Sequence, residues 1–151
     1  MKRQILSAAI AGLLFAGCLC VAWPGAATGD EEVDVVVNKS NSVTTLSLNE
    51  ARKVFMGEKT LWPGGKHIRV FMLAPGVPAR AVVLREIYKM TEADYTKYFL
   101  QAAFNGKVQA PPKDLDTAAQ MKQFLSANPG AIGYLRRIDA DDSVRVVLRL
   151  P

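Results

Sequence analysis

The side chains that carry most catalytic and metal chemistry are sparse in this sequence. His67 is the only histidine among 151 residues, so this chain cannot supply a histidine pair for a base or a metal. No GxSxG or GxxxxGK[ST] motif occurs, and the acidic run at 139–142 lacks the glycine and the bidentate glutamate of a calcium loop. We therefore expect a solvated turn at 139–142 and a non-catalytic protein without a metal or other cofactor.

A group of polar residues follows the first predicted strand, at 33–37. The group contains Asn38, Ser40, Asn41 and Ser42. Ligands of open α/β sheets bind beyond the carboxyl ends of strands, so a ligand site is one interpretation of this group. Turn chemistry is the alternative, because asparagine and serine are favoured in turns whatever the function.

Composition indicates one packed domain with a mildly basic surface. Hydrophobic residues make up 50% of the chain and charged residues 22%, which is typical of a globular domain. The formal net charge is +5. Removing residues 1–27 lowers the basic residues from 19 to 17 against 14 acidic ones, which leaves +3. Because no basic run alternates with aromatic residues, we expect no nucleic-acid partner.

The N-terminal segment has the order of a secretory signal peptide. Two basic residues precede an apolar run at 5–22, and small residues follow at 24–27. That order predicts a signal peptide at 1–27 and an exported, periplasmic domain at 28–151.

Two other interpretations of the apolar run remain open. A retained membrane anchor is one, because the run is close to the roughly 18 to 20 residues that span a bilayer. Lipidation of Cys18 is the other, although Phe15 stands where a lipobox normally carries leucine and the residues after Cys18 stay apolar. Both cysteines, Cys18 and Cys20, lie in this run, so the exported domain would contain no disulfide.

Strand and helix signals alternate along the rest of the chain. Ser47 and Glu50 form a capping-box pattern, and the alternation of Arg145 and Arg149 is typical of an edge strand. Trp62, beside a proline, is expected to plug the edge of the core. Helices are expected near 47–56, 79–89, 91–105 and 116–128, and strands at 33–37, 68–73, 131–135 and 144–150. This order predicts an α/β domain with helices packed on a central sheet of about four strands.

Three segments, in order, resemble the phosphate substrate-binding proteins of ABC transporters. They are VVVNKSNSVTTLSLNEARKVFMGEKTLWPGG at 35–65, FNGK at 104–107 and NPGAIGYL at 128–135. The resemblance spans about 33–135 and implies a single lobe of a type II periplasmic binding protein, with a central mixed sheet flanked by helices. Full-length members of that family hold an anion between two such lobes, and this chain is similar to one lobe only.

The resemblance also implies a place for the anion. In the family, a Ser/Thr-rich glycine loop runs into a helix, and the corresponding loop here is APGVPAR at 74–80. It has no serine or threonine, and its two prolines lack an N–H group. The implied ligand-binding groups are the Arg80 side chain and the amides of Gly76, Val77, Ala79 and Arg80. The alternative is that Arg80 is a solvated surface residue.

The expected function follows from this resemblance. It implies an exported solute-binding module that holds phosphate or a related oxyanion weakly, because half of a two-lobe clamp encloses its ligand less completely. Its partners would be the oxyanion and an ABC permease or another envelope protein. The alternative is a single-lobe interaction module for an envelope or membrane partner that has lost small-molecule binding. The proline-rich loop favours this alternative, since a shared fold does not establish a shared function.

Overall fold

The structure, a computed structural model, describes residues 31–108 and 111–151. The expected signal peptide and the candidate lipidation site at Cys18 lie outside these residues. The elements are β1 (Val33–Asn38), α1 (Leu48–Phe55), β2 (Arg69–Leu73), α2 (Pro78–Val83), the π-helix η1 (Leu84–Tyr88), α3 (Glu92–Phe104), β3 (Lys113–Leu115), α4 (Ala118–Ala127), β4 (Ala131–Arg136), the 3-10 helix η2 (Arg137–Asp139) and β5 (Val144–Arg149). None of the helices in the described ranges is long and apolar enough to cross a membrane.

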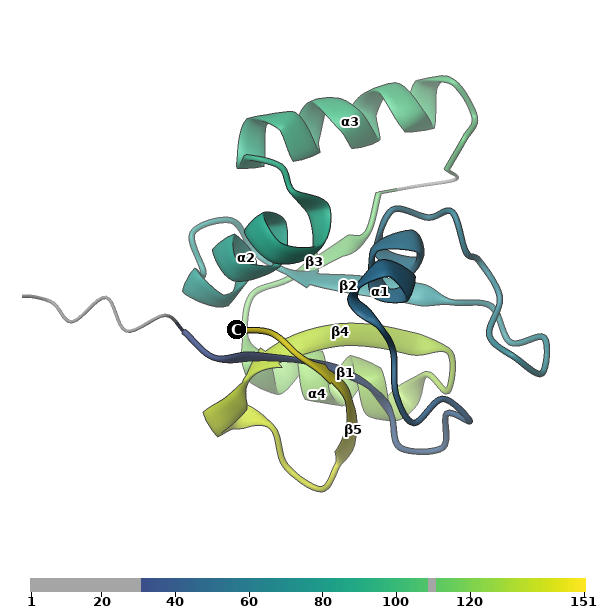
Figure 1. Cartoon of the computed structure of the whole chain (residues 1–151), viewed down its shortest axis with the longest axis vertical. Coiled ribbons are helices and arrows are strands. Elements are labelled where there is room, and N and C mark those ends of the chain that lie inside the picture. Colours follow the sequence, from purple (N-terminus) through teal and green to yellow (C-terminus); the bar gives the residue numbers. More distant parts are fainter. Residues whose placement is uncertain (1–30, 109–110) are drawn as a thin grey trace, which may run out of the picture.

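A five-stranded mixed sheet forms the centre of the molecule, in the order β3-β2-β4-β1-β5 (Figure 1). β2 runs parallel to β3 and β4, whereas β1 runs antiparallel to β4 and β5. The α/β class and the edge position of the last strand are confirmed. The expected number of strands was one too low, because β3 has three residues of which only Leu115 is buried. So short a strand has no periodic signal.

Local sequence explains where the helices begin. Ser47 caps α1, and the Glu50 carboxylate accepts a hydrogen bond from the Ser47 amide, which completes the expected capping box. The hydroxyls of Thr91 and Thr117 cap α3 and α4 by accepting from the amides of Asp94 and Gln120. The expected continuous helix at 79–89 is instead α2 followed by the wider π-helix η1, which ends at Lys89 with a positive φ of 57°.

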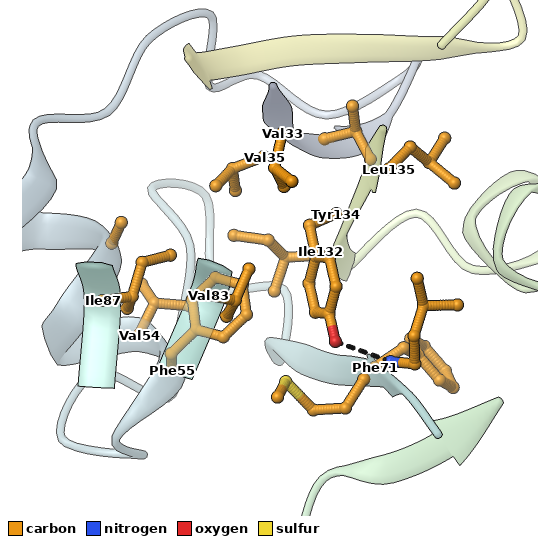
Figure 2. Packing of buried hydrophobic residues seen from close by; sticks show 14 of the residues in the cluster. Val33, Val35, Val54, Phe55, Phe71, Val83, Ile87, Ile132, Tyr134 and Leu135 are labelled. Atoms are coloured by element: carbon orange, nitrogen blue, oxygen red, sulfur yellow. Dashed lines mark hydrogen bonds between the residues drawn. The ribbon is translucent and has the colours of Figure 1, made fainter. Parts of the chain in front are cut away.

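Helices cover both faces of the sheet (Figure 1). Alternate residues of β4 show this, because side chains on a strand point to opposite faces. Ile132 points towards Val83, and Tyr134 points towards β2 (Figure 2), where its hydroxyl accepts a hydrogen bond of 2.8 Å from the Leu73 amide. On the other face, a Cβ on Gly133 would lie 2.4 Å from the Met121 sulfur of α4. The core is therefore continuous on both sides of the sheet.

α3 is the outermost helix and packs on the domain through aromatic rings. Tyr95 and Phe99 place their rings 5.0 and 6.1 Å from the ring of Tyr88 in η1. The opposite face of α3 carries Leu100 and Phe104, which are 70% and 92% exposed. Its inner face thus joins the core, while two large apolar residues remain at the surface.

Candidate functional site

Arg80 lies at the start of α2, and its side chain is buried rather than solvated. It donates two hydrogen bonds to Glu92, of 2.9 and 2.7 Å. It also donates one of 2.7 Å to Asp114 and one of 2.6 Å to the Leu73 carbonyl. Four of the five N–H groups of a guanidinium are therefore used within the described residues. The interpretation of Arg80 as a solvated surface residue is wrong, since the residue is only 2% exposed.

The charge balance around Arg80 differs from that of an open anion site. Burial by itself would lower the pKa of Arg80, but the hydrogen bonds and charges of Glu92 and Asp114 outweigh it and raise the pKa above its ordinary value. Arg80 therefore stays charged. The two carboxylates add two negative charges, and their side chains are 43% and 45% exposed. The cluster of Arg80, Glu92 and Asp114 therefore carries a net negative charge.

Tyr95 covers this cluster from α3. Its ring lies 4.9 Å from the Arg80 guanidinium carbon, a cation–π distance. Burial raises the pKa of Tyr95, and the nearby Arg80 offsets only part of that effect. The Tyr95 hydroxyl is buried and has no hydrogen-bond partner among the described residues. Arg80 is thus held by α3, β3 and the end of β2 together.

Three of the expected ligand residues line one hollow beside this cluster. Gly76, Val77 and Arg80 line a space of about 280 Å³, and its charged and polar lining also includes Arg85, Thr91 and Glu92. Ala79 is fully buried. The amides of Val77 and Arg80 donate to the carbonyls of Ala74 and Val77. Of the four amides considered from the sequence, those of Gly76 and Ala79 therefore remain as candidate donors to a ligand.

The polar group after β1 stabilises turns. Asn38 donates to the carbonyls of Leu125 and Ser126 and accepts from the amide and hydroxyl of Ser40. These bonds satisfy both ends of its buried side chain, and they tie β1 to α4.

Asn41 and Ser42 have similar roles. Asn41 donates to the Pro129 carbonyl and accepts from the Val43 amide, and Ser42 donates to the Pro63 carbonyl. The contacts match the turn interpretation of this polar group.

The two candidate sites considered from the sequence lie at opposite ends of the sheet. The end of β1 is beside the start of β4, where Val37 pairs with Ile132. The start of β2 is at the same end, where Arg69 pairs with Ala131. The Asn38 turn therefore lies at one end of the sheet and the loop after β2 at the other. The expectation for the Asn38 turn assumed that the carboxyl ends of the strands lie at one edge of the sheet. That holds only for parallel strands, and β1 is antiparallel to β4.

The structure assigns ordinary roles to other polar residues noted in the sequence. Trp62 is buried as expected, and its indole N–H donates to the Gly130 carbonyl. His67 is exposed. In the acidic turn, Lys122 forms an ion pair with Asp141. The hydrogen bonds from Lys122 and Ser143 lower the pKa of Asp141. Within 31–108 and 111–151, no group of three acidic, histidine or cysteine residues could hold a metal ion.

Glu92 and Asp114, the partners of Arg80, could not be identified from the sequence. They lie 12 and 34 residues further along the chain, and no local pattern connects them. Glu92 carries an ordinary sequence role as an acidic residue in the first turn of α3. The only usable signal was the placement of Arg80 beside residues of the apolar stripe in its helix, which points to burial.

No family model matches the sequence, but the fold matches solved phosphate receptors. An ABC-type phosphate transport receptor from Vibrio cholerae superposes with a TM-score of 0.61 at 18% identity, over 76% of this chain and 44% of that one. A putative phosphate ABC transporter substrate-binding protein with bound phosphate, from Clostridium perfringens, gives 0.60 at 23% identity, over 76% and 43%. PstS from Borrelia burgdorferi gives 0.58 at 12% identity, over 76% and 46%.

These comparisons confirm the predicted fold. The chain spans less than half the length of each of these proteins, and its mixed sheet flanked by helices corresponds to one part of the phosphate-receptor fold. At such identities the likeness establishes the fold alone, since the same fold can carry different functions.

Proposed function

We propose that this protein is an exported, non-catalytic binding module that holds phosphate or a related oxyanion weakly in the hollow beside Arg80. The observation that carries the proposal is that Gly76, Val77 and Arg80 line one hollow in a fold shared with phosphate receptors. A buried, permanently charged guanidinium is a suitable partner for an oxyanion, and the amide of Gly76 is a second candidate donor beside it.

Weak binding follows from the pairing of Arg80. An oxyanion that contacts the guanidinium must displace Glu92 or Asp114, or else use the remaining N–H group. The two carboxylates also repel it across a short distance. The affinity of the wild-type protein is therefore set by competition between the ligand and the protein's own carboxylates.

Neutralising either carboxylate tests this competition. Glu92→Gln and Asp114→Asn each remove one negative charge next to Arg80, and we expect each to tighten phosphate binding by about tenfold because repulsion of the anion falls. Titration calorimetry of the wild type and both variants measures the change. Glu58→Gln, which removes an exposed carboxylate outside this hollow, is the matched control and should leave the affinity unchanged.

Absence of phosphate binding in all of these proteins would contradict the proposal. Thermal melting of each variant shows whether it is folded, and a bound ligand raises the melting temperature by mass action. Export is tested separately: the chain recovered from the periplasm should begin near residue 28 by mass spectrometry. A chain that retains residues 1–27 would contradict the signal peptide.

The second candidate function is an interaction module for an envelope or membrane partner. Leu100 and Phe104 favour it, because they lie one turn apart on α3 and are 70% and 92% exposed. Large exposed apolar residues grouped on one face are typical of interaction surfaces. A photo-crosslinking residue at position 104 should then give one discrete product in cells. The same residue at Ala119 on α4 is the control, and equal labelling from both positions would argue against a specific partner.

A further inference from the structure

The net positive charge of the domain is concentrated in one short stretch of the chain. Residues 52–69 contain five basic residues and one acidic residue, Glu58. The rest of 31–151 contains twelve basic and twelve acidic residues, so it carries no net charge. We call 52–69 the basic segment. Its basic residues are Arg52, Lys53, Lys59, Lys66 and Arg69.

The charges of the basic segment are not neutralised by the rest of the fold. Four of the five side chains are exposed, and the fifth, Lys59, is half-buried. None of them forms an ion pair within 31–108 and 111–151. The carboxylate of Glu50 is nearby, but it accepts hydrogen bonds from the amide and hydroxyl of Ser47. These bonds lower the pKa of Glu50, and the charges of Lys59 and Lys53 add to that effect.

The second half of the basic segment is a hairpin that the core holds in place. Leu61 pairs with His67 across it, and the Trp62 amide donates to the Lys66 carbonyl at 2.8 Å. Trp62 is buried, and its indole N–H donates to the Gly130 carbonyl. The chain between α1 and β2 projects at the same end of the sheet as α1, away from α2 (Figure 1). The basic residues of α1 and of the hairpin are therefore presented at one end of the molecule.

Apolar side chains are exposed beside these charges. Leu61 is 44% exposed and Leu48, at the start of α1, is 43% exposed. Pro63, at the turn of the hairpin, is exposed as well. Anionic headgroups attract basic residues, and apolar side chains among those residues can enter the boundary between headgroups and acyl chains. The basic segment thus combines the two features that bind a protein to an anionic lipid surface.

We propose that the basic segment binds this protein to a membrane surface rich in anionic phospholipids. Its lysines and arginines contact the headgroup phosphates, and Leu61 enters the interface. A nucleic acid fits less well, because base stacking uses exposed aromatic rings, and those of Phe55 and Trp62 are buried. The segment shares no residue with the hollow beside Arg80, so this site is additional to the proposed oxyanion site.

Co-sedimentation with lipid vesicles tests the proposal on the chain recovered from the periplasm. We expect binding to vesicles of equal parts phosphatidylglycerol and phosphatidylcholine, and little binding to phosphatidylcholine alone. Raising the salt from about 0.1 M to about 1 M shortens the Debye length from about 10 to about 3 Å and should release the protein. Equal binding to both kinds of vesicle would overturn the proposal. Stronger release by inorganic phosphate than by sodium chloride of equal ionic strength would also overturn it.

Paired double variants separate a local surface from net charge. Arg52→Ala/Lys66→Ala should weaken binding to the mixed vesicles by on the order of 20-fold, or about fivefold for each charge removed near the lipid. Arg149→Ala/Lys97→Ala is the matched control, because it removes one exposed arginine and one exposed lysine outside the basic segment. The control should bind like the wild type. Equal losses in the two variants would overturn the role of the segment.

Leu61→Ser distinguishes a lipid surface from an acidic macromolecule. It should weaken vesicle binding about fivefold, because less apolar surface enters the interface. Binding to poly-L-glutamate or duplex DNA as tight as that to the vesicles, without an effect of Leu61→Ser, would overturn the lipid assignment. None of these variants changes a residue that lines the hollow beside Arg80, so calorimetry with phosphate tests the oxyanion site independently.

Discussion

A second hollow, which we call the α1–α3 groove, is lined by residues of α1, β2 and α3 among others. The hollow beside Arg80 and the α1–α3 groove both contain positive charge, but the availability of that charge differs. In the first, one guanidinium is held by two carboxylates and a backbone carbonyl at 2.6 to 2.9 Å. In the second, four basic residues line an apolar space without an acidic one among the described lining. Removing a buried charge that is paired within the protein is expected to affect mainly the stability of the fold. Removing a charge at an open rim is expected to affect mainly the attraction of charged ligands.

The largest expected effect tests whether Arg80 is an internal brace. Arg80→Met removes four hydrogen bonds and leaves the buried Leu73 carbonyl without its donor, so we expect it to lower the free energy of unfolding by about 3 kcal/mol. Lys107→Ala, at the exposed rim of the groove, should change it by less than about 0.5 kcal/mol. Urea denaturation of the two variants provides the comparison. A loss below about 1 kcal/mol for Arg80→Met would contradict the role of Arg80 as an internal brace.

A smaller effect is expected from the helix that forms one wall of the groove. Ser47→Ala removes the side-chain cap of α1 and should lower the free energy of unfolding by about 1 kcal/mol. The cap is a local interaction over three residues, unlike the Arg80 cluster, so its loss should leave phosphate binding unchanged. Urea denaturation and calorimetry on this variant measure both quantities. A change in phosphate affinity would show that the two regions are coupled.

The smallest expected effect concerns pH. The hydrogen bonds from the Ser47 backbone and hydroxyl lower the pKa of Glu50 below its ordinary value of 4.5. The stabilisation from Glu50 is therefore complete above that pH and is lost as the pH falls through the lower pKa of the folded state. Unfolding measured from pH 6 down to about pH 3 should give a shallower acid slope for Glu50→Gln than for the wild type. Identical slopes would contradict the assignment.

Much of the fold could be predicted because its signals are local. The caps at Ser47, Thr91 and Thr117 each use a hydroxyl within three residues of the amide that it accepts from. The motif NPGAIGYL was recognised as a family feature, and the structure gives its physical basis. A Cβ on Gly130 would lie 2.0 Å from the His67 carbonyl oxygen, so β2 and β4 can approach only if that residue is glycine.

The candidate site was harder to predict because its geometry is not local. The sequence suggested that Arg80 is either an anion ligand or a solvated surface residue. In the structure its side chain is buried and contacts Glu92, Asp114 and Tyr95, which neither interpretation included. The polar group at Asn38 was considered as a ligand site, but its side chains satisfy turns and tie β1 to α4. The antiparallel direction of β1, which no residue pattern specifies, separates it from the Arg80 loop.

By itself, the sequence determined the class of the fold, the starts of the helices, the edge strand and the scarcity of catalytic groups, because caps, periodicity and composition act over a few residues. Only the tertiary structure decided which charges are paired and which remain at an open rim. That outcome depends on residues up to 34 positions apart meeting at one point, and on the direction in which each strand crosses the sheet.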